Sequence, residues 1–222
     1  MPPASRTTSA ARRHSRTMAY TTRELGIQTL QDFEALAAQQ GECWCMFYQR
    51  ARPAGRGLTR DERRARNRAD KRSLVSEGRA HAILVYEGRT PVGWCQYGTA
   101  EELPRIDAGR SYRKVAPPVP RDRLWRVTCF FVAKDHRGKG VASFALEAAL
   151  ESIRRKGGGI VEAYPVVSKR MAAVPEWRWF GTPGMFHKAG FEDIAPLGTS
   201  GVLMRKVVLP VARIRRPGRD GR

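Results

Sequence analysis

The chain has 222 residues, 41% of them hydrophobic, which suits one domain with a sizeable core and excludes a largely disordered protein. No apolar stretch approaches the ~20 residues that a membrane-spanning helix needs, which excludes a transmembrane span. We expect a cytoplasmic protein with reduced cysteines and without a membrane partner. The net charge is +20, but 33 of the 41 basic residues are arginine, a bias typical of G+C-rich genomes, so the sequence does not favour a nucleic-acid partner.

Both ends of the chain are basic and lack an apolar pattern. Residues 1–19 contain four arginines and no acidic residue, without the apolar core of a secretory signal. We expect a disordered tail there, with Met18 as an alternative start, although an arginine- and serine-rich composition also occurs in transit peptides. Residues 210–222 form a second basic tail, which leaves 20–209 as the organised domain.

The first half of the chain carries the patterns of two helices and a hairpin. Thr59 and Glu62 have the spacing of a capping box, which begins a very basic helix. In chain order, we predict a helix over 29–39, a strand over 43–48, the basic helix over 59–77, and a hairpin over 80–86 and 91–97, followed by a proline-rich connector to residue 120.

The second half begins with the most apolar strand of the chain, over 124–133. A glycine-containing loop leads from it into an amphipathic helix that runs to about residue 156. We then predict a strand over 160–166, a short helix capped by Thr182 and closed by Gly190, and two last strands over 191–195 and 202–209. The four cysteines (43, 45, 95 and 129) lack zinc or disulfide spacing, so we expect reduced structural thiols and no metal site.

The loop before the amphipathic helix has the features of an anion site. Amides in the first turn of a helix lack intrahelical acceptors, and the helix dipole adds partial positive charge. Gly138 and Gly140 let a phosphate approach the backbone, and Arg137 and Lys139 add cationic charge. The sequence therefore predicts a diphosphate site, with a plain glycine turn as the alternative.

Two common nucleotide motifs do not fit this loop. The chain contains no Walker A string. A dinucleotide fingerprint fails at its third glycine, where the chain has Ser143, and an antiparallel hairpin precedes the loop instead of a βαβ unit. Only Glu162 favours a dinucleotide-binding loop, because it follows the loop at the sequence separation expected of a ribose-binding acid.

The string Arg137-x-x-Gly140-x-Ala142, after an apolar strand and before a long helix, resembles the pyrophosphate loop of the GNAT superfamily of N-acetyltransferases. The ending Ala189-Gly190-Phe191 before a strand is also typical of that family, and the order of elements agrees over about residues 25–209. The resemblance implies a single α/β domain with a mixed central sheet, two splayed parallel strands, and helices on both faces. It also implies transfer of acetyl from acetyl-CoA to a primary amine by direct attack, without a covalent intermediate.

The resemblance assigns acetyl-CoA binding to the end of the strand and to the loop. Main-chain groups at the end of the strand would bond the acetyl and pantetheine part, and the amide near Val132 would stabilise the oxyanion. Loop amides would hold the pyrophosphate. The implied binding residues are Phe130, Phe131, Val132, Arg137, Gly138, Lys139, Gly140, Val141, Ala142 and Ser143.

The usual acid and base of the family are missing from their positions. Arg126 stands where the histone-acetyltransferase branch has its glutamate, and Phe186 where many members have a tyrosine. Glu162 is a candidate base, and Tyr164 and His187 are candidate acids. Alternatively, Glu162 pairs with an arginine, His187 lies on a helix surface, and proximity alone drives the reaction.

The acceptor is unidentified, and the sequence leaves a small molecule or a protein open. In the family the acceptor site is shaped by segments that here hold Trp44, Tyr48, Arg52, the basic helix and Trp177–Trp179. These aromatic residues could equally be packing, and the basic helix a solvated face or an attractor for the 3′-phosphate of coenzyme A. The alternatives to an enzyme are a non-catalytic acyl-CoA-binding module whose basic tails bind nucleic acid or an acidic protein, and a plain nucleic-acid binder. The sequence leaves open whether the chain is a monomer or a homodimer.

Overall fold

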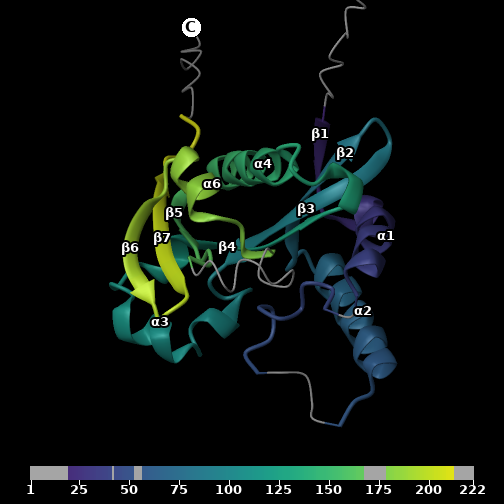
Figure 1. The fold of residues 1–222 in the computed structure, drawn as a ribbon, viewed down its shortest axis with the longest axis horizontal. Coiled ribbons are helices and arrows are strands. Elements are labelled where there is room, and N and C mark those ends of the chain that lie inside the picture. Colours follow the sequence, from purple (N-terminus) through teal and green to yellow (C-terminus); the bar gives the residue numbers. More distant parts are fainter. Residues whose placement is uncertain (1–19, 42, 53–56, 168–178, 213–222) are drawn as a thin grey trace, which may run out of the picture.

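The computed structural model describes residues 20–41, 43–52, 57–167 and 179–212. The strands among them form one seven-stranded sheet (Figure 1). Its strand order is β1-β2-β3-β4-β5-β7-β6. Only the β4–β5 pair is parallel. The strands are β1 (Tyr20–Glu24), β2 (His81–Glu87), β3 (Thr90–Thr99), β4 (Leu124–Val132), β5 (Gly159–Ala163), β6 (Glu192–Leu197) and β7 (Gly201–Val208).

Helices cover both faces of the sheet, as expected (Figure 1). Side chains of α4 pack with β2 to β5 in one apolar cluster, whereas α1 packs in a second cluster on the other face. The helices are α1 (Leu30–Gln40), α2 (Arg60–Ser76), α3 (Arg110–Val115), α4 (Val141–Arg155) and α6 (Pro183–Lys188). The mixed sheet and its flanking helices confirm the predicted α/β class.

The local signals for helix ends are confirmed. Thr59 Oγ1 accepts from the amide of Glu62 at 3.3 Å, and Glu62 Oε2 accepts from the amide of Thr59 at 2.8 Å. At α6, Thr182 Oγ1 accepts from the amide of Met185 at 3.3 Å. These short-range bonds need only neighbours in the sequence, so the sequence could specify them.

Four expectations about elements were wrong or incomplete. The segment over 43–48 is a turn because Trp44 and Cys45 both have a φ of 52°, which no strand contains. Strand β1 was missed, and β5 ends at Ala163 instead of residue 166. The proline-rich connector contains α3 and packs against the sheet.

The described part of the chain has no helix long and apolar enough to cross a membrane.

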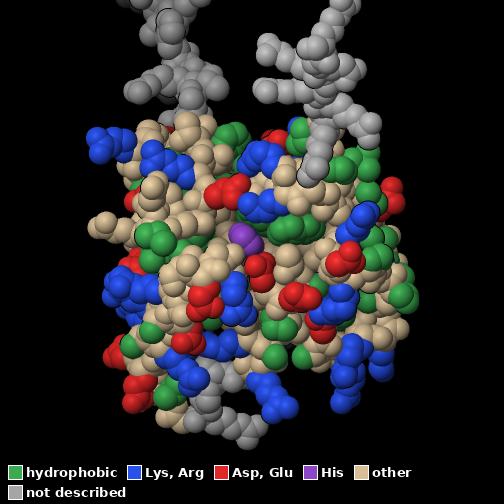
Figure 2. Space-filling model, turned by 180° about the vertical axis from the view of Figure 1, so that it is seen from behind, with side chains coloured by type: hydrophobic (Ala, Val, Ile, Leu, Met, Phe, Trp, Pro, Cys, Tyr) green, Lys and Arg blue, Asp and Glu red, His purple; other side chains and the backbone are tan. Residues whose placement is uncertain are grey.

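The basic helix is mostly a solvated face, with one exception. Lys71 of α2 is only 2% exposed, and its Nζ donates to Gln49 Oε1. Burial lowers the pKa of Lys71 to about 8. On the face shown in Figure 2, basic and acidic side chains are interspersed, so the net charge does not gather there into one basic patch.

Arg126 of β4 fastens the connector to the sheet. Its side chain is fully buried, and its Nη1 donates to the carbonyls of Ala100 and Leu103 at 3.1 and 2.8 Å. It also forms an ion pair with Asp107. Burial raises the pKa of Asp107, but the bonds from Arg126 and Arg121 outweigh it and hold that pKa below its usual value.

Replacing Arg126 by methionine is expected to lower the free energy of unfolding by about 3–5 kcal/mol, because Asp107, Ala100 and Leu103 lose their buried donor. Arg121→Met is a matched control, since Arg121 binds the same carboxylate from a side chain that is 53% exposed. It should cost less than about 1 kcal/mol. Denaturant unfolding measures both, and equal losses would contradict this account.

Candidate acetyl-CoA site

The parallel pair β4–β5 opens partway along its length. Its last paired residues are Val127 and Ala163, although β4 continues to Val132. A register shift in the β3–β4 pairing, between Gln96 and Tyr97, lies at the same level. Because β5 ends at Ala163, β4 runs past it, and no described strand pairs with that edge of its last residues.

The register shows which amides of β4 face this open edge. The amide of Ala133 donates to the carbonyl of Val92 on β3, at 2.9 Å. The backbone N–H and C=O groups of successive strand residues point to opposite sides. The amide of Phe131 therefore also points to β3, whereas the amides of Phe130 and Val132 point to the open edge. The carbonyl of Val132 accepts from Arg137 Nε at 3.1 Å.

The glycine loop follows directly and ends at the first turn of α4. Gly138 and Gly140 have φ values of 72° and 83°, a left-handed conformation that favours glycine. The first bond within the helix joins the amide of Phe144 to the carbonyl of Gly140 at 3.0 Å. The three amides before it have no intrahelical acceptor, so they are available to an anion.

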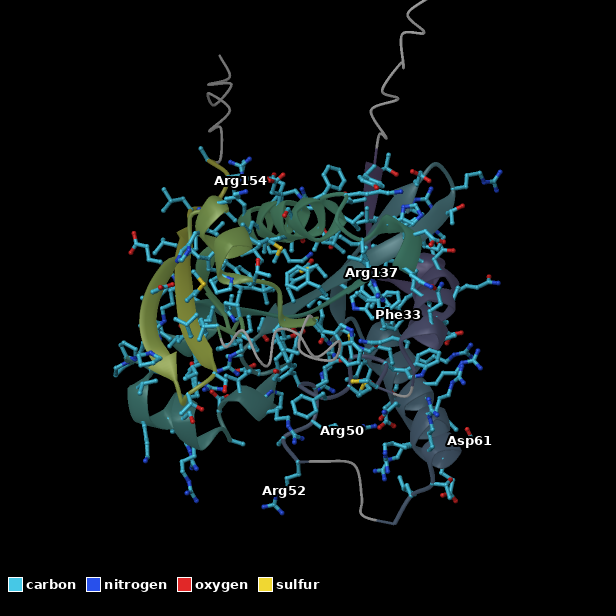
Figure 3. All side chains as sticks on the ribbon, viewed as in Figure 1. Phe33, Arg50, Arg52, Asp61, Arg137 and Arg154 are labelled. Atoms are coloured by element: carbon cyan, nitrogen blue, oxygen red, sulfur yellow. The ribbon has the colours of Figure 1, made fainter. Side chains whose placement is uncertain are left out.

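A cavity of about 550 Å³ joins the loop, the start of α4 and the end of β4; we call it the loop cavity. Nine of the ten predicted binding residues line it, and only Lys139 does not. Arg137, one of the nine, is labelled in Figure 3. The remaining lining residues come from α1, the 3₁₀ turn before α4 and the segment up to α6: Gln39, Gln40, His136, Trp179, Gly181, Thr182 and Met185.

Two of these seven residues, none of which was predicted to bind the cofactor, hold an unpartnered polar atom. Among the described residues, Gln40 Oε1 and His136 Nδ1 are buried without a hydrogen-bond partner. Such atoms are costly unless something bonds them, so they fit a cavity that takes a polar ligand. Sequence reasoning missed Gln40, at the end of a helix, and His136, because neither belongs to a recognisable motif.

A second cavity, of about 270 Å³, adjoins the first; we call it the thiol pocket. Trp179 lines both cavities. Cys129, which lines the thiol pocket, directly precedes Phe130, which lines the loop cavity, in the sequence. Tyr48 and Trp179, from the segments predicted to shape the acceptor site, line this pocket, whereas Trp44 is buried against Phe33. The pocket is lined by Cys43, Cys45, Phe47, Tyr48, Gln96, Cys129, Trp179 and Phe180.

The cysteines are free thiols, as expected, but three of them gather in this pocket. Cys45 Sγ accepts from Trp94 Nε1 at 3.1 Å. The hydrogen bond that Cys129 makes to Cys45, together with burial, raises the pKa of the Cys129 thiol. In the described residues, no group of three or more His, Cys, Asp or Glu side chains is arranged to hold a metal ion.

The candidate acid and base residues lie outside both cavities. Glu162 is fully buried: its Oε1 accepts from Arg205 Nε, and its Oε2 accepts from the hydroxyls of Tyr112 and Tyr164, each at 2.8 Å. Burial raises the pKa of Tyr164 well above its usual range. His187 is half-exposed and bonds Asp193 at 2.9 Å, so the structure does not bring it to Glu162. Of the predicted acceptor segments, Arg52 is exposed and Trp177 lies outside the described residues.

The split sheet and the glycine loop define the class of acetyltransferases that the sequence resembles. The profile of the acetyltransferase (GNAT) family matches residues 29–182, and the chain belongs to that family. No curated protein sequence matches the chain.

Several solved structures are similar to this chain at low sequence identity. A GNAT-family protein from Desulfovibrio desulfuricans is 14% identical, with a TM-score of 0.50 over 86% of this chain and 99% of its own. The yncA protein of Salmonella typhimurium, solved with its cofactor acetyl-CoA, is 16% identical, with a TM-score of 0.49 over 90% and 99%. The ribosomal-protein-S18-alanine N-acetyltransferase of Escherichia coli is 12% identical, with a TM-score of 0.47 over 90% and 100%.

Alanine at two glycines tests the conformation of the loop. A Cβ at Gly140 or at Gly184 of α6 meets no other atom within 4 Å, but only Gly140 has a left-handed φ. Gly140→Ala should lower the free energy of unfolding by about 1–2 kcal/mol. Gly184→Ala should raise it by about 0.5–1 kcal/mol. Chemical denaturation measures both, and a neutral Gly140→Ala would show that the loop is not held in this conformation.

Proposed function

We propose that this chain transfers the acetyl group of acetyl-CoA to a primary amine of a small-molecule or protein acceptor. One observation carries the proposal: a single cavity joins an anion-binding helix start to the unpaired edge of β4. A diphosphate and a thioester are separated parts of one molecule, so a ligand that carries both matches both ends of the cavity.

The start of α4 supplies the site for the pyrophosphate. The loop conformation leaves the amides of the first turn without intrahelical bonds, and the helix dipole adds positive charge. Arg137 places a cation at the same end of the cavity. Its bond to the carbonyl of Val132 also fixes the loop to β4, so the two binding elements keep one spacing.

The open edge of β4 supplies the site for the thioester. Bound acetyl-CoA supplies an activated acetyl carbonyl there. The amide of Val132 faces this edge, while the carbonyl of Val132 is already bonded to Arg137. The amide is therefore a fixed donor for negative charge on the acetyl oxygen, the role of an oxyanion hole.

The surroundings of Glu162 favour its pairing role over general-base catalysis. Its carboxylate accepts from Arg205, Tyr112 and Tyr164, and it is fully covered by protein. We propose that the chain accelerates transfer mainly by holding thioester and amine together, with the amine deprotonated by solvent. Tyr164 and His187 stay predictions as acids, and neither lines the loop cavity.

Calorimetric titration with acetyl-CoA tests the binding part of the proposal. We expect about micromolar affinity, weakened at least about tenfold by Gly140→Asp, which puts negative charge where the pyrophosphate would lie. Gly78→Asp is the control: it adds the same charge at another left-handed glycine with open space around it, at the end of α2. No binding by the unaltered chain would refute the proposal, and binding without acetylation of any amine would favour a non-catalytic acyl-CoA-binding module.

Glu162→Gln separates the two roles of that residue. Loss of the buried ion pair with Arg205 should lower the free energy of unfolding by about 3–5 kcal/mol. Below the unfolding temperature, kcat should change less than about tenfold, and its pH profile should keep its shape. A loss of about 10²–10⁴-fold in kcat, together with the disappearance of the acidic limb, would instead identify Glu162 as the base.

A further inference from the structure

The thiol pocket offers an entrance to the open edge of β4 that is separate from the loop cavity. Cys129 and Phe130 are neighbours on β4, and their side chains belong to the apolar clusters on opposite faces of the sheet. Phe130 lines the loop cavity and Cys129 the thiol pocket. The loop cavity is also lined by Phe131, whose side chain lies on the face of Cys129, so a molecule in the thiol pocket lies beside the loop cavity along the same stretch of strand.

Among the described residues that line the thiol pocket, none is Asp, Glu, Lys or Arg. Its one amide side chain, Gln96, is already bonded: Nε2 donates to the carbonyl of Cys45 at 2.9 Å, and Oε1 accepts from Thr128 at 3.1 Å. The contacts that these described side chains offer are therefore mainly apolar and aromatic, with a hydroxyl and thiols but no charge to pair with a second charge on a ligand.

The aromatic wall of the pocket is built before any ligand binds. The rings of Phe47 and Tyr48 meet edge to face, 4.9 Å apart, and Tyr48 meets Phe180 in the same way at 6.1 Å. Arg105 of the connector lies over the Phe47 ring, 4.0 Å from its centre. Because these rings are already held, a flat ligand orders few side chains on entry.

We infer that the acceptor carries its primary amine on one uncharged aromatic group, which occupies the thiol pocket. This inference rests on the proposed function. A volume of about 270 Å³ lies just below the ~300–1,000 Å³ typical of drug-sized ligands, which suits a single ring. A free arylalkylamine and the amino terminus of a peptide that begins with an aromatic residue share this chemistry.

Matched acceptors test the inference. With saturating acetyl-CoA, kcat/KM for phenethylamine should exceed that for ethanolamine and for spermidine at least about tenfold. A peptide beginning with phenylalanine, compared with the same peptide beginning with serine, distinguishes a peptide source from a free amine. Equal or faster turnover of ethanolamine or spermidine, with no preference between the peptides, would overturn the inference and leave acetyl transfer itself established.

Phe47→Ala tests whether the pocket creates this preference. The ring is half-exposed, so its removal should not unfold the chain, and it should reduce the preference for the aromatic amine about tenfold. Phe47→Leu should restore part of it. Ile27→Ala, at a side chain that is 73% exposed and outside the pocket, should leave it unchanged. An unaltered preference in Phe47→Ala would contradict the assignment.

A binding measurement decides the inference even if no amine is acetylated. Cys43 is the one partly exposed cysteine, and it lines the pocket. In the presence of acetyl-CoA, phenethylamine should slow alkylation of Cys43 by iodoacetamide several-fold, measured by mass spectrometry, whereas ethanolamine should not. Equal labelling rates with both amines would overturn the inference independently of turnover.

Discussion

The point where β4 and β5 stop pairing governs the rest of the structure. Up to Val127 and Ala163 the two strands pair; beyond them β4 stays paired only with β3, and the amides of Phe130 and Val132 turn toward an edge that no described strand covers. Backbone groups inside a protein need hydrogen-bond partners, so an unpaired strand edge within a cavity favours an occupant with polar groups in an extended row. The glycine loop and the start of α4 form the end of the cavity away from β4, where they favour an anion.

The two ends of the β4–β5 pair have opposite characters. Where the strands pair, their charged side chains are neutralised by nearby residues: Arg126 bonds Asp107 of the connector, and Glu162 bonds Arg205 of β7. Tyr112 of α3 covers this end and bonds Glu162. The polar side chains at this end are thus committed to one another, and the open end offers backbone amides, thiols and aromatic rings. We therefore propose that binding and chemistry take place at the open end.

The sequence predicts features that depend on near neighbours, and it misses those that depend on distant ones. The capping box at Thr59 and the loop at Gly138 and Gly140 each lie within a few residues, and the resemblance identified nine residues of the loop cavity. The turn at Trp44 and Cys45 was missed because packing, not local propensity, holds it at positive φ. Two of the three partners of Glu162, Arg205 and Tyr112, lie 43 and 50 residues away in the sequence, so the sequence alone could not select Arg205 among the many arginines. The thiol pocket draws on four separate segments, and no periodicity marks it.

Hydrogen exchange of individual amides, with and without acetyl-CoA, tests the central claim most directly. The claim is that the unpaired edge of β4 and the first turn of α4 bind the two ends of one ligand. It predicts that acetyl-CoA slows exchange at Phe130, at Val132 and at the amides of residues 141–143, while Phe131, already bonded to β3, changes little. Protection confined to other segments, or none at Val132, would contradict it.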